Sequence, residues 1–270
     1  MKKKVLVVVD MQNDFVTGSL GTKEAEAIVP RVIERIRAFA HLDEREQAAR
    51  EHAAAPGKQA QANTASASDT RRAADSAAPD AACAPDKPEK AAASDSACTG
   101  SCSSCGSGCG GHAPIVMDEA RYDALFGETL VVFTQDTHET DYLSTQEGQK
   151  LPVPHCLRGT AGWELIPEIA ALQQKYGWTI YEKPTFGCVA LAEDLAAQEI
   201  AQGIESIELV GLCTDICVVS NALLLKAYLP EVPIVVTAAC CAGVTPEKHE
   251  AALETMRSCQ VEVRDSFHIS

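Results

Sequence analysis

The chain has 270 residues, 46% of them hydrophobic, and carries a formal net charge of −15 at pH 7. This composition is ordinary for a globular protein with an apolar core. The negative charge excludes non-specific binding to DNA or RNA, because a phosphate backbone requires a basic surface.

The chain begins with Met1 and three lysines, followed by an apolar run from Val5 to Val9 that ends at Asp10. Such a β-branched run predicts a strand buried on both faces. It is too short for an export signal, and no other segment approaches the roughly 18 apolar residues of a membrane span. We therefore expect a cytoplasmic protein with no membrane segment, in which the 12 cysteines are thiols or metal ligands.

A helix is predicted next, because apolar residues recur at helical spacing from Ile28 to Ile36. From Asp43 to Pro114 the chain then contains no Val, Ile, Leu, Met, Phe, Trp or Tyr. A stretch of this composition buries too little apolar surface to offset its ordering entropy. We interpret residues 43–114 as a low-complexity, disordered insertion, and residues 1–42 and 115–270 as one domain.

Strands and helices alternate in the remainder, which predicts a mostly parallel α/β sheet with right-handed crossovers. The predicted strands cover residues 130–133, 178–181, 207–210, 233–237 and 261–263. One helix is predicted to start near Ile216, and another to cover residues 248–258. Ligands bind at the carboxyl ends of strands in such sheets. Four strand ends carry reactive side chains, namely Asp10, Asp136 with His138, Lys183, and the segment 211–217.

Cys217 is the candidate nucleophile of this edge. A thiol in the first helical turn after a strand feels the positive end of the helix dipole, and with Lys183 nearby we expect its pKa to be lowered. Asp10 is placed to act as general acid and base, and the backbone amides of Cys213 and Cys217 to hold an oxyanion. Position alone leaves open that Cys217 is simply a small buried hydrophobe.

Three segments resemble the motifs of isochorismatase-like hydrolases, in the same order. Residues 9–15 (VDMQNDF) resemble the D-x-Q-x-D-F motif, residues 183–187 (KPTFG) the catalytic-lysine segment, and residues 210–218 (VGLCTDICV) the nucleophile loop. The resemblance implies a three-layer, Rossmann-like fold with a six-stranded sheet, a triad of Asp10, Lys183 and Cys217, and a cis peptide at Leu212–Cys213. A cysteine nucleophile implies the branch of the family that hydrolyses small amides.

Asp136, His138 and His155 offer oxygen and imidazole ligands suited to zinc, iron or manganese. In nicotinamidases of this family, the matching Asp and two His bind a metal with a further His, whose position here falls near Tyr142. Glu147 aligns with a glutamate that replaces that His in some members. The predicted set is therefore Asp136, His138, Glu147 and His155, with a divalent metal, zinc first. The alternative is that Asp136 and His138 only hydrogen-bond a loop and Glu147 is a solvated charge.

The leading functional hypothesis is a nicotinamidase-like amidase, with Phe15 and Phe186 as candidate pocket walls for a flat ring. An enzyme acting on another small amide, such as an N-carbamoyl compound, is the nearest alternative. A third hypothesis is a metal-handling protein that uses the cysteines and histidine at 98–112 within the insertion, since dense thiolates bind metals. The expected partner is a small amide, and homo-oligomerisation stays open.

Overall fold

A sheet of six parallel strands forms the centre of the fold, in the order β3-β2-β1-β4-β5-β6. The computed structural model describes residues 2–54 and 127–266. Within them the strands are β1 (Lys3–Val9), β2 (Thr129–Asp136), β3 (Thr179–Lys183), β4 (Ile204–Leu212), β5 (Ile234–Ala242) and β6 (Glu262–Arg264). The predicted α/β class and six-stranded sheet are confirmed, and every strand pair in the described part is parallel.

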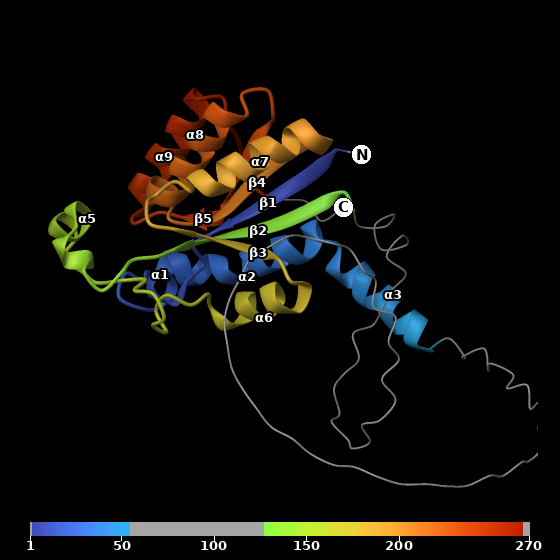
Figure 1. Cartoon of the computed structure of the whole chain (residues 1–270), viewed down its shortest axis with the longest axis horizontal. Helices are drawn as coiled ribbons and strands as arrows, with labels where there is room; N and C mark the ends of the chain where they lie inside the picture. The colour runs from blue at the N-terminus through green and yellow to red at the C-terminus, as the bar shows by residue number, and fades with distance from the viewer. Residues whose placement is uncertain (1, 55–126, 267–270) are drawn as a thin grey trace, which may run out of the picture. The chain divides into compact units, whose positions relative to one another are not determined.

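Helices cover both faces of the sheet (Figure 1). On one side lie α7 (Val189–Gln202), α8 (Val219–Tyr228) and α9 (Pro246–Ser258); on the other lie α1 (Asn13–Val16), α2 (Lys23–Phe39) and α6 (Pro167–Tyr176). The shorter elements are η1 (Tyr142–Ser144), α5 (Gln146–Lys150) and the π-helical turn η2 (Thr214–Val218), and α3 (Leu42–Ala54) follows α2. This is the three-layer arrangement that the sequence predicts.

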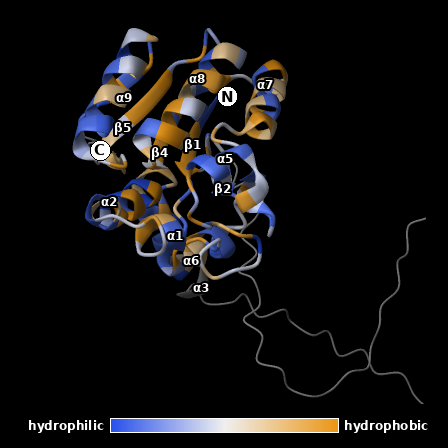
Figure 2. Ribbon diagram, turned by 90° about the vertical axis from the view of Figure 1, so that its left-hand side faces the viewer, coloured by the Kyte–Doolittle hydropathy of each residue, from blue (hydrophilic) through white to orange (hydrophobic). Residues whose placement is uncertain are grey.

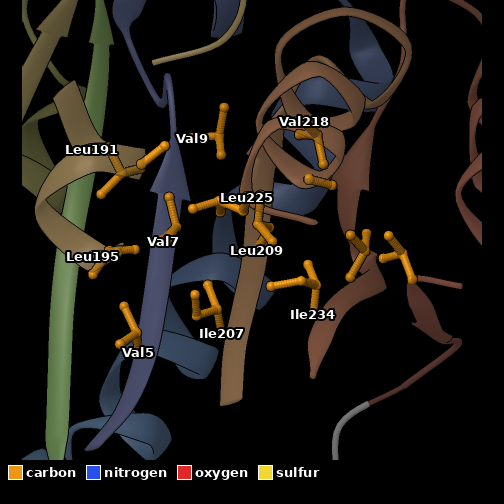
Figure 3. Close-up of a cluster of buried hydrophobic side chains, with 14 of the residues drawn as sticks. Val5, Val7, Val9, Leu191, Leu195, Ile207, Leu209, Val218, Leu225 and Ile234 are labelled. Carbon is orange, nitrogen blue, oxygen red and sulfur yellow. The ribbon is translucent and has the colours of Figure 1, made fainter. Parts of the chain in front are cut away.

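Side chains that alternate along β1 build two separate cores, one on each face. Val5, Val7 and Val9 belong to the core beneath α7, α8 and α9, where Leu191 and Leu225 meet them (Figure 3). The intervening Leu6 and Val8 belong to the opposite core, with apolar residues of α2 and α6. Hydropathy colouring shows mostly apolar strands between helices that carry both hydrophobic and hydrophilic residues (Figure 2). Because both faces of β1 are covered, its residues from Val5 to Val9 are all apolar and buried.

The strand order reverses at β1. The chain runs from β1 outward to β2 and β3, then returns to place β4 on the other side of β1. In open parallel sheets, ligands bind outside the carboxyl ends of the strands at such a switch point. The ends of β1 and β4 therefore mark where the site is expected.

The predicted start of the insertion at residue 43 is too early. Helix α3 continues to Ala54, and Glu46 fixes it to α6 by accepting hydrogen bonds from Lys175 Nζ at 2.7 Å and from the Tyr176 hydroxyl at 3.1 Å. Residues 43–54 contain no Val, Ile, Leu, Met, Phe, Trp or Tyr, but Ala, Glu, Arg and Gln are strong helix formers. The rest of the predicted insertion from residue 55, including the cysteine cluster at 98–112, lies outside the described residues.

One smaller difference concerns the length of β5. The strand runs on to Ala242, well beyond the predicted end at residue 237, and Cys240 and Cys241 in this extension are both buried. Among the described helices, none is both long enough and apolar enough to cross a membrane.

Candidate active site

The carboxyl ends of β1, β2 and β3 bring three charged side chains together in the interior. Asp10 follows β1 directly, whereas Asp136 and Lys183 are the last residues of β2 and β3. Their exposed fractions are 0%, 3% and 1%. Asp10 has a φ of 47°, in the left-handed region that residues other than glycine rarely adopt. Such strained residues cluster at functional sites.

The Lys183 ammonium is the centre of this group. Its Nζ lies 2.8 Å from Asp10 Oδ2, 3.0 Å from Asp136 Oδ1 and 3.4 Å from Cys217 Sγ. Thr134 Oγ1 donates a hydrogen bond of 2.6 Å to the other oxygen of Asp10. The structure therefore brings together all three residues of the predicted triad, with one cation touching the thiol and both carboxylates.

Burial governs the ionisation of these groups. It raises the pKa of the Cys217 thiol well above its ordinary value, the Asp10 charge adds to the rise, and Lys183 only partly opposes it. The pKa of Asp10 is also raised by burial, against the effect of Lys183. For Lys183, burial opposes the charged form, but Asp10 and Cys217 raise its pKa above the ordinary value. The expectation of a lowered pKa for Cys217 is wrong, because removal from water outweighs the neighbouring cation.

The nucleophile loop is shaped by its own backbone. Gly211 has a φ of 115°, and a Cβ there would lie 2.2 Å from the Val9 carbonyl oxygen, so the close approach of β4 to β1 requires glycine. The Leu212–Cys213 peptide is cis, as the resemblance implies. Cys217 lies in η2, a π-helical turn rather than the predicted first α-helical turn, and π turns are frequent at functional sites. Asn221 Nδ2 donates to the Cys217 carbonyl at 2.8 Å.

Beside the triad, Asp136, His138 and His155 form a buried cluster whose ligand atoms all lie within 4.8 Å of one another. His138 Nε2 is 3.0 Å from Asp136 Oδ2, and it is a buried nitrogen without a hydrogen-bond partner in the described structure. His155 Nδ1 lies 2.8 Å from the Val153 carbonyl. A carbonyl only accepts, so Nδ1 carries the proton and Nε2 offers its lone pair to the cluster, as in histidines that bind metals.

Glu147 approaches the same point from α5. Its Oε1 lies 3.7 Å from His138 Nε2 and 3.9 Å from His155 Nε2, and the side chain is 24% exposed. Tyr142 packs its ring against both imidazoles and donates its hydroxyl proton to the Leu151 carbonyl at 3.0 Å. Tyr142 therefore supports the histidines, and Glu147 lies beside the three-residue cluster, close to both imidazoles. The residues fit a divalent metal by charge, by donor type and by the unpartnered imidazole nitrogen.

Gln12 connects the two strands that carry the carboxylates, a role that the sequence does not reveal. Its side-chain amide donates to the backbone carbonyls of Asp136 at 2.8 Å and Trp163 at 2.7 Å, and its Oε1 accepts from the Asp136 amide at 2.7 Å. In parallel, Asp14 Oδ2 accepts the backbone N–H of Cys156 at 2.8 Å, next to His155. The resembling motif contains both residues, but their partners lie more than 120 positions away and leave no local signal.

A cavity of about 510 Å³ opens onto both groups. Cys213, Cys217, Asp136, Glu147 and His155 line it, together with the two predicted wall residues Phe15 and Phe186. Phe15 is 8% exposed, whereas Phe186 is 45% exposed. Further wall residues that sequence reasoning missed include the apolar Leu20, Leu151, Ile216 and Val244 and the polar Gln146, Lys150 and Lys248. The cavity volume is within the range of small-molecule sites.

Comparison with known proteins places the chain in a family. The family model for the isochorismatase domain matches residues 118–266, more than half of the chain. The chain belongs to the isochorismatase family. The resemblance read from the three sequence motifs is thereby confirmed.

Individual isochorismatase relatives agree with this assignment. An uncharacterized isochorismatase family protein of Bacillus subtilis, PncA, is 32% identical over 127 residues, which are 46% of this chain and 67% of that protein. The crystal structure of nicotinamidase PncA from Bacillus subtilis has a TM-score of 0.57 at 22% identity, covering 97% of this chain and 99% of that one. Pyrazinamidase of Pyrococcus horikoshii in complex with zinc has a TM-score of 0.53 at 20% identity, covering 98% and 99%. At these identities the two structures show a shared fold.

Proposed function

We propose that this protein is a cysteine-dependent amidohydrolase that converts a small carboxamide, nicotinamide first, into the carboxylate and ammonia. The observation that carries the proposal is the buried Lys183 ammonium in contact with Asp10, Asp136 and Cys217. Of these residues, Asp136 and Cys217 line the cavity. Structural relatives named as a nicotinamidase and a pyrazinamidase support an amide substrate.

In the first half-reaction, Asp10 takes the thiol proton and the Cys217 sulfur attacks the carboxamide carbon. Because burial raises the pKa of both groups, Asp10 is a stronger base than an ordinary carboxylate, and the thiol stays neutral until substrate is present. Lys183, 3.4 Å from the sulfur, stabilises the developing thiolate. The backbone amides of Cys213 and Cys217 donate to the oxyanion. The protonated Asp10 then gives its proton to the leaving nitrogen, and ammonia departs.

In the second half-reaction, Asp10 removes a proton from water, which attacks the thioester carbon. The C–S bond breaks, the acid product leaves, and Cys217 recovers its proton from Asp10. One water is consumed for each amide, and no external oxidant or reductant is needed. The same carboxylate thus serves as base and acid in both halves, as its position between Thr134 and Lys183 allows.

The metal site is part of the proposal. Asp136, His138 and His155, with Glu147, would hold a divalent metal, zinc first and iron or manganese as alternatives. Such a metal would supply a coordination point for water and for a ring nitrogen of the substrate, beside the sulfur. The pyrazinamidase relative solved in complex with zinc supports this assignment.

The cavity favours an aromatic carboxamide over an N-carbamoyl compound. Its wall is largely apolar and places Phe15 against the His155 ring at a centroid distance of 5.6 Å. A flat heteroaromatic ring gains dispersion and aromatic contact from such walls. A polar carbamoyl chain would gain less from these apolar walls, although Gln146, Lys150 and Lys248 also line the cavity.

The decisive experiment is an ammonia-release assay on a panel of small amides, including nicotinamide, pyrazinamide and N-carbamoyl compounds, with Cys217→Ala as the matched control. We expect nicotinamide or a close ring amide to be hydrolysed, and Cys217→Ala to remove activity with its circular dichroism spectrum unchanged. Activity of Cys217→Ala within tenfold of the parent would exclude the nucleophile assignment.

The domain organisation is a separate proposal. Residues 2–54 and 115–266 are proposed to be sufficient for catalysis, and residues 55–114 to be an insertion that does not contribute to it. Replacing 55–114 with a short Gly-Ser linker tests this. Retained ammonia release supports the proposal, whereas metal uptake lost with the insertion, in a parent that lacks amidase activity, would support the metal-handling alternative.

A further inference from the structure

The nucleophile loop is tied to α9 by a partly buried polar contact that the mechanism above does not use. Thr214 Oγ1 lies 2.8 Å from His249 Nδ1. Thr214 is fully buried and lies in η2, between Cys213 and Cys217. Burial lowers the pKa of His249 below its ordinary value, so its ring is neutral at neutral pH and pairs with a hydroxyl without burying a charge.

A second contact holds the same loop from the same side. Asp215 Oδ1 accepts the backbone N–H of Val244 at 2.9 Å. Gly243 lies between these contacts: a Cβ there would meet Asp215 Oδ1 at 2.8 Å and His249 Cα at 3.0 Å. The segment that leads into α9 is thus packed against the loop too closely for any larger residue at 243.

We propose that His249 is a positioning residue of the nucleophile loop: through Thr214 it fixes the backbone that presents Cys213 and Cys217 to the cavity. The proposal rests on the proposed function of Cys217. His249 does not line the cavity and acts only through the loop. A loop that carries both the nucleophile and the oxyanion donors must hold them in one geometry, since a shift of about 1 Å costs about 100-fold in rate.

Two matched pairs of substitutions test the contact. His249→Leu removes the ring nitrogen, whereas His249→Asn keeps a polar atom on the same branching carbon. Thr214→Val removes the hydroxyl at nearly constant volume, and Thr214→Ser keeps it. Thr255→Val serves as a control on α9, because the Thr255 hydroxyl bonds only the Ala251 carbonyl of its own helix in the described structure.

The first measurement is kcat and KM for the amide that the parent hydrolyses best. We expect His249→Leu and Thr214→Val to lower kcat by roughly 10- to 100-fold with KM changed less than about threefold. His249→Asn and Thr214→Ser should recover most of the loss, and Thr255→Val should resemble the parent. Because the two residues act through one contact, the double variant His249→Leu/Thr214→Val should be little worse than either single variant.

The second measurement does not depend on activity. The amides of Ile216 and Val218 bond the Cys213 carbonyl at 3.1 Å and 3.0 Å, so their hydrogen exchange reports the order of the loop. Exchange should be faster in His249→Leu but not in His249→Asn. Unchanged exchange, or a His249→Asn enzyme as slow as His249→Leu, would overturn the positioning role. A parent inactive on every amide would instead refute the proposed function, and the exchange data would still decide the role of His249.

Discussion

The candidate site has two halves, the catalytic triad and the predicted metal ligands, which differ in burial and in the contacts that connect their residues. In the triad half, Asp10, Lys183 and Cys217 are each at most 4% exposed and are connected through one ammonium. In the metal half, the imidazoles of His138 and His155 lie near the carboxylates of Asp136 and Glu147. The Glu147 side chain is partly exposed to solvent. Asp136 belongs to both, because its Oδ1 faces Lys183 at 3.0 Å and its Oδ2 faces His138 at 3.0 Å. Substitutions in the triad half should therefore leave metal binding intact, except at this one carboxylate.

Among the substitutions that test this division, Asp10→Asn should have the largest effect. The amide keeps the shape of the carboxylate but cannot take the thiol proton, so we expect kcat to fall by about 1,000-fold or more. Metal content, measured by elemental analysis, should stay at the parent value, because the side chain of Asp10 pairs with Lys183 and Thr134 in the described part of the chain, and neither of these is a predicted metal ligand. Loss of the metal together with the activity would contradict the division between the halves.

Asp136→Asn should disturb both halves. It removes a charged ligand and one of the two carboxylates on Lys183, so we expect about one metal ion fewer per chain than in the parent and a kcat lower by roughly 10- to 100-fold. Measuring the difference from the parent cancels any metal bound elsewhere in the chain. His138→Ala is the control, because it should lose the metal without touching Lys183. A normal metal content in both variants would remove the proposed metal site.

Glu147→Gln tests whether Glu147 is a ligand of the proposed metal. Its Oε1 lies 3.7 Å and 3.9 Å from the two imidazole nitrogens, and the side chain is more exposed than Asp136. We expect a metal dissociation constant raised about tenfold, from competition with a chelator, and an almost unchanged kcat at saturating metal. Glu139→Gln, on the same loop but paired with Arg158 at 2.8 Å, is the matched control. Equal affinities in both variants would place Glu147 outside the site.

Much of the fold and of the edge that carries the site could be predicted from the sequence. A strand buried on both faces is uniformly apolar, and the first polar residue after it marks the carboxyl end of the strand; β1 and Asp10 illustrate this. Parallel strands place their carboxyl ends at one edge of the sheet, so Asp136 and Lys183, the last residues of β2 and β3, lie there as well. The family membership rested on three short motifs that lie at these strand ends.

What the sequence could not give depends on contacts between distant residues. The pKa of Cys217 was misjudged because the helix dipole and a cation can be read locally, whereas the extent of burial cannot. Gln12, His249 and the ordered helix α3 were likewise missed. Their partners (Trp163, Thr214 and Lys175) come from other parts of the chain, and composition alone assigned the start of α3 to the insertion.

Phe15 and Phe186 provide the test with the smallest expected effect, because one lies in each half of the candidate site. Phe15 packs against His155 in the metal half and belongs to the buried core, whereas Phe186 follows Lys183 in the triad half and is 45% exposed. We expect Phe15→Leu to raise KM for the ring amide by roughly two- to tenfold and to lower stability by about 1 kcal/mol. Phe186→Leu should raise KM by only about two- to threefold, because solvent already covers much of the ring, and should leave the thermal midpoint unchanged. If both variants bind substrate like the parent, the ring does not lie between these side chains, and the case for an aromatic amide over an N-carbamoyl compound is lost while the triad assignment stands.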